Sequence, residues 1–288
     1  MIIMADGETM KLVHEATDRL IAALEAGESD QLKAYLSAMG RFHGYSPGNV
    51  LLISIQFPRA SRVAGYRTWQ SLRRQVRKGE RGIRVLAPIV CRDRDCDDDR
   101  DRVVAFKTAS VFDVSQTEGA PLPQFAEVRG EPGVLLAALK MSIANQGIEL
   151  IYIDGPASLQ GWSGGGRIAV RRGLTPAEEF STIVHELAHS RLHEHEDEKS
   201  SRTVQETEAE AVAFVVCEAI GLDTNRAGAD YIQLYRGSRD TPVASLERIH
   251  RTAAGILADL DDQRIAVGRS SSSEIGVPLS IIAKRPAA

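Results

Sequence analysis

The stretch HELAH, at residues 185–189, combines residue types and a spacing that are hard to explain without chemistry. On a helix, positions i and i+4 lie one turn apart on the same face, so the imidazoles of His185 and His189 can point at one metal ion. Glu186 then lies beside that ion. This is the HExxH pattern, in which two histidines bind Zn²⁺ and the glutamate takes a proton from a water molecule at the metal. The pattern predicts zinc-dependent hydrolysis, with Glu186 as the general base.

The residues before this stretch indicate that it lies on a helix. Thr175 can serve as the N-cap, Pro176 suits the first helical position, and Glu178 can complete a capping box with Thr175. Apolar residues then recur at helical spacing at Phe180, Ile183, Val184, Leu187 and Ala188. Because this stripe would bury one side of the helix, we expect both histidines to lie on a helix that packs against a core.

A catalytic zinc site needs a third protein ligand and an open position for water. One candidate is His195, ten residues after His185, where the pattern HExxHxxGxxH places its last histidine. That pattern turns the chain at a glycine, and Leu192 stands there in this sequence. The run HEHEDE at residues 193–198 is more typical of a solvated acidic connection.

A second kind of candidate lies on the helix expected over residues 204–220. Its front end carries Glu206, Glu208 and Glu210 in a run that becomes apolar, and a buried carboxylate is costly unless it is paired or bound to a cation. Glu208 and Glu210 lie two positions apart, about 200° around a helix, so they cannot both face one ion. The alternative is that all three are first-turn acids favoured by the helix dipole.

Length and composition agree with an intracellular hydrolase without specifying one. A chain of 288 residues is long enough for two domains, and its formal net charge of −4 neither favours nor excludes a nucleic-acid partner. We see no apolar run of membrane-spanning length and no secretory leader, so we expect a soluble cytoplasmic protein. The three cysteines, at positions 91, 96 and 217, do not suggest a disulfide framework or a zinc ribbon.

The charge balance changes sharply between residues 57 and 90. This window contains eight arginines and Lys78 against the single acid Glu80, and it also contains Tyr66 and Trp69. Basic side chains neutralise phosphates and exposed aromatic rings stack on unpaired bases, a combination that favours single-stranded nucleic acid. The alternative is a solvated basic helix over residues 69–76 with both aromatic rings in the core.

The remaining elements follow from periodicity and turn residues. We expect helices over residues 10–24, 30–39, 50–55, 133–146, 227–235 and 243–260, and strands over 82–90, 102–112, 148–153 and 167–171. A charged loop is expected over 93–101, a linker over 119–123, a hairpin turn over 161–166 and a weakly ordered tail from residue 268. The strand at 167–171 precedes the HELAH helix and could pair with a peptide substrate by strand addition.

Several motifs, taken in order, resemble a known family. They are FHGYSPGN at residues 42–49, QFPRA at 56–60, VAGYRTW at 63–69, KGERGI at 78–83 and VFDVSQT at 111–117. On these motifs the N-terminal half resembles the single-stranded-DNA-binding domain of ArdC-type antirestriction proteins. The C-terminal half, with HELAH and the glutamate-rich helix, resembles the ImmA/IrrE-like zinc metallopeptidases that ArdC proteins carry. Together the two resemblances cover nearly the whole chain apart from its tail.

The resemblance implies an α+β fold with an N-terminal DNA-binding domain over residues 1–125, a zincin-like, gluzincin-type peptidase domain over 126–266, and a tail over 267–288. It favours Glu208 as the third zinc ligand, with Glu210 in reserve, because Ala211 and Phe214 then fall in the family's register. Val212 departs from the family, which often has asparagine or an acid there.

The same resemblance supports nucleic-acid contacts in the N-terminal half. The residues we expect to contact DNA are Tyr45, Asn49, Arg67, Trp69, Arg73, Arg74, Arg77 and Lys78. The family further implies a protein of mobile genetic elements that shields incoming single-stranded DNA from host restriction, with an unidentified protein or peptide as peptidase substrate. Two alternatives stay open: a DNA-coating protein with a structural or inactive zinc site, and an ImmA-like protease that cleaves a repressor.

Overall fold

The computed structural model describes residues 7–26, 29–91, 102–120, 132–156, 159–193, 202–222 and 240–270. Helices and separate small sheets make up an α+β fold, which divides into two compact units. Among the described residues, the first unit comprises 7–20 and 44–120, and the second comprises 21–43 and everything from 132 onward. Residues 21–43 thus belong with the second unit, although they precede most of the first. The assignment of functions to residues 1–125 and 126–266 stays a prediction.

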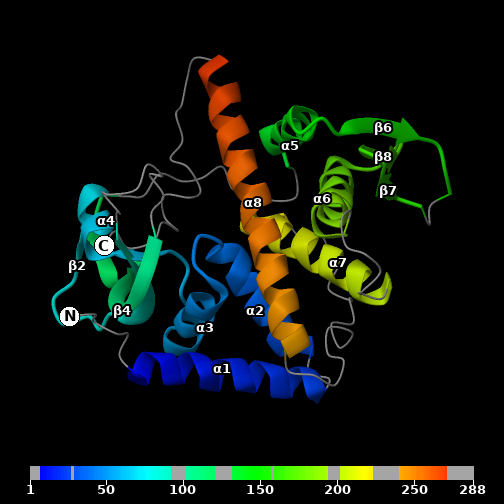
Figure 1. Cartoon of the computed structure of the whole chain (residues 1–288). Helices are drawn as coiled ribbons and strands as arrows, with labels where there is room; N and C mark the ends of the chain where they lie inside the picture. Colours follow the sequence, from blue (N-terminus) through cyan, green and yellow to red (C-terminus); the bar gives the residue numbers. More distant parts are fainter. Residues whose placement is uncertain are drawn as a thin grey trace. The chain divides into compact units, whose positions relative to one another are not determined.

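The first unit is built around an antiparallel sheet in the order β1-β4-β3, of which β4 is labelled in Figure 1. A two-stranded ribbon of β2 and β5 lies in the same unit. The sheet strands are β1 (Val63–Gly65), β3 (Ile83–Cys91) and β4 (Arg102–Asp113); the ribbon strands are β2 (Arg74–Val76) and β5 (Thr117–Gly119). Its helices are the first part of α1 (Gly7–Glu25), α3 (Pro47–Gln56), α4 (Tyr66–Ser71) and the short 3-10 turn η1 (Val114–Gln116).

The second unit combines helices with a three-stranded sheet in the order β6-β8-β7 (Figure 1). Its helices are α2 (Ser29–Arg41), α5 (Val134–Asn145), α6 (Pro176–His193), α7 (Arg202–Ala219) and α8 (Asp240–Ser270). Its strands are β6 (Glu149–Ile153), β7 (Gly161–Gly164) and β8 (Arg167–Arg171). Strand β8 runs parallel to β6 and antiparallel to β7. Gly165 and Gly166 both have positive φ, of 58° and 73°, and form the two-residue turn between β7 and β8.

Helix α6 begins as the sequence predicts. The backbone N–H of Thr175 donates to Glu178 Oε2 at 2.8 Å, and the N–H of Glu178 donates to Thr175 Oγ1 at 3.3 Å, which confirms the capping box. The five apolar residues of the predicted stripe are all buried: Phe180, Ile183, Val184, Leu187 and Ala188. The helix that carries the two histidines is therefore fixed at its start by hydrogen bonds and along one side by the core.

Helices α2 and α7 of the second unit approach closely. A Cβ atom added to Gly40 would lie 2.8 Å from the backbone oxygen of Val215 and 3.3 Å from the backbone nitrogen of Ala219. A side chain larger than hydrogen at position 40 would therefore push the two helices apart. The predicted helices over residues 30–39 and 204–220 are both confirmed, within two residues at each end.

Two expectations about local structure are wrong. The basic segment 69–76 is not one helix: α4 ends at Ser71, Arg73 takes a left-handed conformation with φ of 57°, and β2 follows. The strand at 167–171 is present, but it is the middle strand of its sheet, so both of its edges are already paired. The expected loop over 93–101 and helix over 227–235 lie outside the described residues. The weakly ordered tail is expected from residue 268, but α8 continues to Ser270, and the rest of the tail lies outside the described residues.

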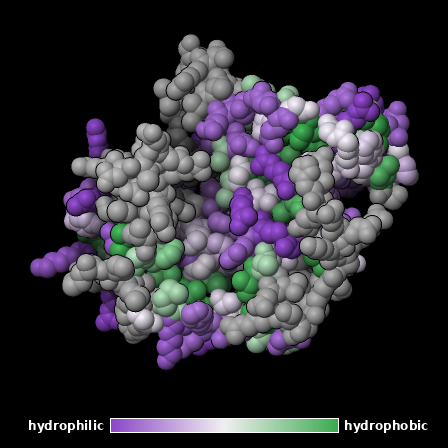
Figure 2. All heavy atoms as spheres, in the orientation of Figure 1, coloured by the Kyte–Doolittle hydropathy of each residue, from purple (hydrophilic) through white to green (hydrophobic). Residues whose placement is uncertain are grey.

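The surface mixes polar and apolar side chains. On the face shown in Figure 2, hydrophilic residues are interspersed with smaller hydrophobic areas. Large apolar side chains that are at least a third exposed include Tyr66, Phe106 and Trp162. The described helices all fall short of the length and apolarity that a membrane span requires.

Candidate metal centre and candidate nucleic-acid surface

The two histidines of HELAH point toward each other's rings on one face of α6. Their Nε2 atoms lie 3.1 Å apart, and the ring centroids are 4.8 Å apart with the rings nearly perpendicular. Both side chains are mostly buried. Two imidazole nitrogens at this separation can both contact one ion at the usual metal-to-nitrogen distance of about 2.0–2.1 Å.

The third member of the group is Glu206, from the beginning of α7. Its Oε2 atom lies 3.4 Å from His189 Nε2 and 3.6 Å from His185 Nε2. One donor atom from each of these three residues lies within 4.8 Å of the other two, so the group could hold a metal ion. Two imidazoles and a carboxylate form a donor set that suits a divalent transition metal such as zinc.

Glu210 lies one helical turn after Glu206, on the same face of α7. Its Oε2 atom is 3.3 Å from Nδ1 of His185, the ring nitrogen opposite the one that faces Glu206. A carboxylate behind a ligating imidazole fixes the ring's orientation and raises its basicity. Glu210 is thus placed to support His185, while Glu206 contributes to the group of donor atoms.

Glu208, the predicted third ligand, does not lie in this group. Its side chain is fully buried on another face of α7, where it accepts a hydrogen bond from Nη2 of Arg248 on α8. The choice of Glu208 is therefore corrected to Glu206 as the carboxylate that meets the histidines. The reason is the direction in which α7 crosses α6: positions 206 and 210 face the imidazoles, and position 208 is turned about 200° from either. His195, the other candidate, lies outside the described residues.

Glu186 is buried beside strand β7. A Cβ atom added to Gly161, the first residue of β7, would lie 3.2 Å from Glu186 Cγ and 2.8 Å from Thr182 Cγ2. The same atom would lie 2.9 Å from the backbone oxygen of Ala169. Only glycine therefore leaves room for the Glu186 side chain between α6 and the sheet. No local pattern predicts this contact, because Gly161 and Glu186 are far apart in the chain.

In the first unit, the two aromatic residues predicted to contact DNA are buried. Trp69 is fully buried and its Nε1 donates to the backbone oxygen of Phe112 at 2.9 Å. Tyr45 is buried as well, and its hydroxyl donates to the backbone oxygen of Val63 at 3.3 Å. Neither ring presents a face to solvent, so neither is placed to stack on a base in this structure.

Asn49, another predicted DNA contact, pairs instead with the outer edge of β3. Its amide accepts from the backbone N–H of Leu86 at 2.8 Å and donates to the Leu86 carbonyl at 2.8 Å. Gln56, two helical turns later on α3, makes the same pair of bonds with Arg84, at 3.0 and 2.9 Å. These two amides therefore satisfy edge backbone groups of β3 that would otherwise need water or another strand.

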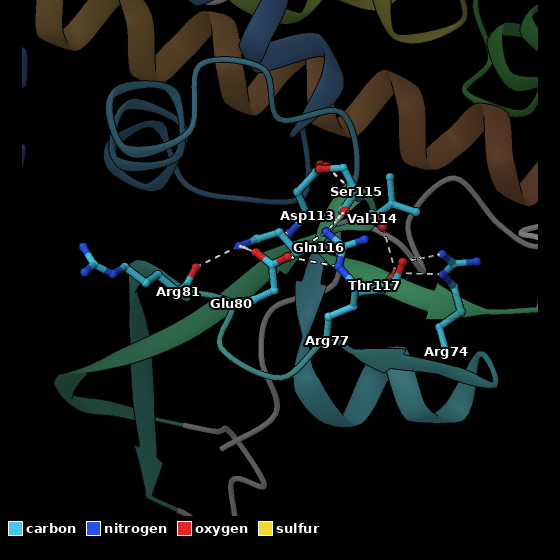
Figure 3. Close-up of polar contacts among 9 residues, drawn as sticks. All are labelled: Arg74, Arg77, Glu80, Arg81, Asp113, Val114, Ser115, Gln116 and Thr117. Carbon is cyan, nitrogen blue, oxygen red and sulfur yellow. Dashed lines mark hydrogen bonds and ion pairs between the residues drawn. The ribbon is translucent and has the colours of Figure 1, made fainter.

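Two of the predicted arginines also have partners within the first unit (Figure 3). Arg74 donates to the side chain and the backbone oxygen of Thr117, at 2.8 and 3.0 Å. Arg77 pairs with Glu80 at 2.6 Å and donates to the backbone oxygen of Ser115 at 2.7 Å. Both guanidinium groups thus hold the segment 114–117. Their predicted contact with DNA stays a prediction.

Asp113 and Gln116 anchor the same segment. The carboxylate of Asp113 accepts backbone N–H bonds from Ser61, Arg62 and Ser115 at 2.7–2.9 Å. Burial alone would raise the pKa of Asp113, but these hydrogen bonds outweigh burial and hold it below its usual value. Hydrogen bonds from Arg77 and Gln116 likewise lower the pKa of Glu80. The motif VFDVSQT is therefore a hydrogen-bonding centre of the first unit (Figure 3).

The remaining predicted DNA contacts, Arg67, Arg73 and Lys78, are exposed. Tyr66, which precedes Arg67 on α4, is 40% exposed and packs edge-on against Phe112 with ring centroids 6.5 Å apart. Its hydroxyl accepts a hydrogen bond from Gln75. Tyr66 was part of the basic window but not among the residues chosen from the sequence; its exposure, opposite to that of Trp69, appears only in the fold.

Comparison with known proteins extends the resemblance. Residues 10–112 match the sequence model of the N-terminal domain of the anti-restriction factor ArdC. An uncharacterized protein of Bacillus anthracis is 28% identical over 273 residues, covering 77% of this chain and 46% of that protein. The chain spans about half the length of this curated relative.

Two crystal structures of the antirestriction protein ArdC from plasmid R388 share the fold. The metal-free structure aligns with a TM-score of 0.50 at 18% identity, covering 87% of this chain and 98% of ArdC. The Mn(II)-bound structure aligns with a TM-score of 0.52 at 19% identity, covering 86% and 98%.

Proposed function

We propose that this chain, an ArdC-type antirestriction protein by the match of residues 10–112 and by its fold, binds single-stranded DNA with its first unit and hydrolyses peptide bonds at a zinc centre in its second. The observation that carries the enzymatic part is the meeting of His185, His189 and Glu206, with Glu186 buried one position after the first histidine.

The residues present fit a zinc ion. His185, His189 and Glu206 would hold it, and among the described residues they are the group that could do so. When bound, zinc supplies Lewis-acid chemistry, which polarises a carbonyl and eases deprotonation of water. Glu210, whose Oε2 lies 3.3 Å from His185 Nδ1, is placed to orient that ring. Glu186 takes the proton of the attacking water and passes it to the leaving amine.

An extended peptide fits the edge of the sheet beside α6. Strand β7 is an edge strand, and its first residue lies against Glu186. A substrate that adds to β7 by main-chain hydrogen bonds would bring its carbonyls toward the two histidines. This replaces the expectation for residues 167–171, because β8 is paired on both sides.

The peptidase is tested with Glu186→Gln. The purified chain and the variant are incubated with a peptide library, cleavage is read by mass spectrometry, and zinc content is measured on both. We expect the variant to lose cleavage and keep its zinc, because the amide cannot accept a proton while the ligands are unchanged. Arg167→Met, which removes an exposed ion pair with Glu149, is the matched control. Equal cleavage by the Glu186→Gln variant would reject the proposed base.

A closed structural zinc site is the competing function for this unit. Such sites are held by four protein ligands, whereas catalytic sites use three and leave a position open. The group contains three members among the described residues, and Glu210 approaches the far nitrogen of His185. The number of donor residues therefore favours a catalytic zinc site over a structural one.

For DNA, the proposed surface consists of Tyr66, Arg67, Arg73 and Lys78, which are exposed in the first unit. Three cationic side chains can neutralise phosphates, and the half-exposed ring of Tyr66 can stack on a base. Stacking on an exposed ring is worth about 1–3 kcal/mol per base.

The test is a titration of a labelled single-stranded oligonucleotide and its duplex at two salt concentrations. We expect Tyr66→Ala to weaken single-strand binding by about 10-fold or more, within the stacking range above. Trp162→Ala removes an equally exposed ring from the second unit and serves as the control. Binding that is insensitive to salt, or unaffected by Tyr66→Ala, would remove this surface from the proposal.

A further inference from the structure

One face of α8 contacts both helices that carry the candidate metal ligands. Arg248 bonds to Glu208 of α7, and Asp259 pairs with Arg191 of α6 at 2.5 Å. Between them lies Gly255, where an added Cβ would be 3.3 Å from Nη1 of Arg191. Positions 255 and 259 follow 248 by close to two and three turns of about 3.6 residues, so the three residues form one stripe.

The contact with α7 fixes the rotation of that helix. Glu208 is fully buried, and a buried carboxylate is costly unless a cation is paired with it. Because Glu208 points about 200° away from Glu206 and Glu210, turning Glu208 toward water would turn the other two glutamates away from the imidazoles. The guanidinium of Arg248 therefore holds α7 at the rotation that the metal group needs.

The contact with α6 works in the same way. Arg191 follows His189 by two positions, and besides Asp259 it donates to Gln146 at the end of α5, at 2.8 Å. These bonds tie the C-terminal half of α6 to α8 and α5, whereas the capping box at Thr175 fixes its other end.

We propose that Arg248 and Asp259 are positioning residues for the metal centre: α8 sets the relative rotation of α6 and α7 by pairing with Glu208 and Arg191. This rests on the proposed metal site. Neither residue contacts the donor atoms, so their effect passes through a buried partner on each helix.

The test is a Co²⁺ titration of the whole chain, read by visible absorption, which reports both affinity and ligand geometry. We expect folded Arg248→Met to bind Co²⁺ about 10- to 100-fold more weakly, the range for supporting contacts, with an altered spectrum. Adding Glu208→Leu should bring affinity back near the native value, because no buried charge then forces α7 to turn. Arg248→Lys, which keeps a cation, should retain most of the affinity. The control Arg167→Met should bind as the native chain does.

Native affinity and an unchanged spectrum in folded Arg248→Met would overturn the inference, as would a double variant that stays as weak as the single one. If Arg248→Met does not fold, Asp259→Asn is tested in its place. We expect Asp259→Asn to bind Co²⁺ more weakly than the native chain, but with a smaller loss than Arg248→Met, because Arg191 keeps its bond to Gln146. Unchanged affinity in Asp259→Asn would overturn the inference. A native chain that takes up no Co²⁺ rejects the metal site itself, and the positioning role with it, whereas native binding with unaffected variants rejects only the role of α8.

Discussion

The imidazoles of HELAH meet a carboxylate from another helix, whereas the polar side chains of VFDVSQT meet backbone groups of their own unit. Both stretches combine polar residues in a fixed order, and both looked functional in the sequence. In the second unit the donors converge on a point that a cation can occupy. In the first unit, Asp113 and Gln116 bond to backbone N–H and C=O groups, Gln116 also bonds to Glu80, and together they hold a turn.

The two stretches differ in which partners can satisfy their polar side chains. A buried carboxylate or amide can be satisfied by backbone groups alone, and it then stabilises the fold and has nothing left for a ligand. Two imidazole nitrogens 3.1 Å apart facing a carboxylate gain most from a shared cation. A motif of polar residues is thus evidence of function only after its hydrogen bonds are known.

The most severe test of this contrast is His189→Ala. Removing a ligand should lower the affinity for Zn²⁺ well beyond the roughly 10- to 100-fold typical of supporting contacts, while the unfolding of the first unit stays unchanged. Competition titration with a chromophoric chelator measures the affinity. Native zinc affinity in the variant would show that the histidine pair is not the metal centre.

Asp113→Ala should lower the stability of the first unit and leave the metal centre unaffected. Removing a buried carboxylate that accepts three backbone N–H bonds should cost about 3 kcal/mol of unfolding free energy, because the N–H groups lose their partner. Urea unfolding followed by tryptophan fluorescence measures it, with Trp162→Phe in both chains so that the signal comes from Trp69. Zinc affinity should be unchanged; a loss of zinc with no loss of stability would reverse the roles we assign.

Asn49→Ala should cost about 1–3 kcal/mol, because the backbone N–H and C=O of Leu86 lose both bonds. If Asn49 contacted DNA, the variant would instead be stable and bind an oligonucleotide poorly. Urea unfolding and an oligonucleotide titration on the same sample separate the two outcomes. Ser71→Ala, an exposed hydroxyl bonded within its own helix, is the control for stability.

The acid dependence of stability should follow Asp113 as well. Because its pKa is lower in the folded chain than in the unfolded chain, its contribution is complete above the unfolded value of about 3.9 and is lost as the pH falls through the folded value. Urea unfolding between about pH 6 and pH 2 should therefore show a smaller decrease in Asp113→Asn than in the native chain. An equal decrease in both would mean that Asp113 gains nothing from its N–H donors.

The smallest effect is expected at Lys78, an exposed member of the proposed DNA surface. Lys78→Ala should leave the unfolding free energy within about 0.5 kcal/mol, and it should lower the slope of log affinity against log salt by about one. Oligonucleotide titrations at several salt concentrations measure that slope. An unchanged slope removes Lys78 from the surface.

Features that depend on residues close together in the chain are predicted correctly from the sequence. The capping box at Thr175, the apolar stripe of α6 and the i, i+4 spacing of the histidines depend on neighbours within one or two turns, and the structure contains them. The resemblance to ArdC-type proteins is confirmed by the match of residues 10–112 and by the fold.

The errors concern contacts between distant segments. Whether Glu206 or Glu208 faces the histidines depends on where α7 crosses α6, which helical spacing alone does not determine. Trp69 and Tyr66 lie three positions apart on α4 and both contact Phe112 of β4, yet Trp69 is fully buried and Tyr66 is exposed. The middle position of β8 follows from pairing with β6, which no local pattern encodes.

The close passage of α2 over α7 at Gly40 has a consequence for cutting the molecule. A truncation that starts after residue 120 discards α2 and exposes the side of α7 that α2 covers, so we expect the rest of the second unit not to be stable alone. During synthesis α2 leaves the ribosome long before α7, so the two helices can pack together only after residue 219 has been made. Supplying residues 21–43 as a separate peptide should rescue such a truncated fragment, as in fragment complementation.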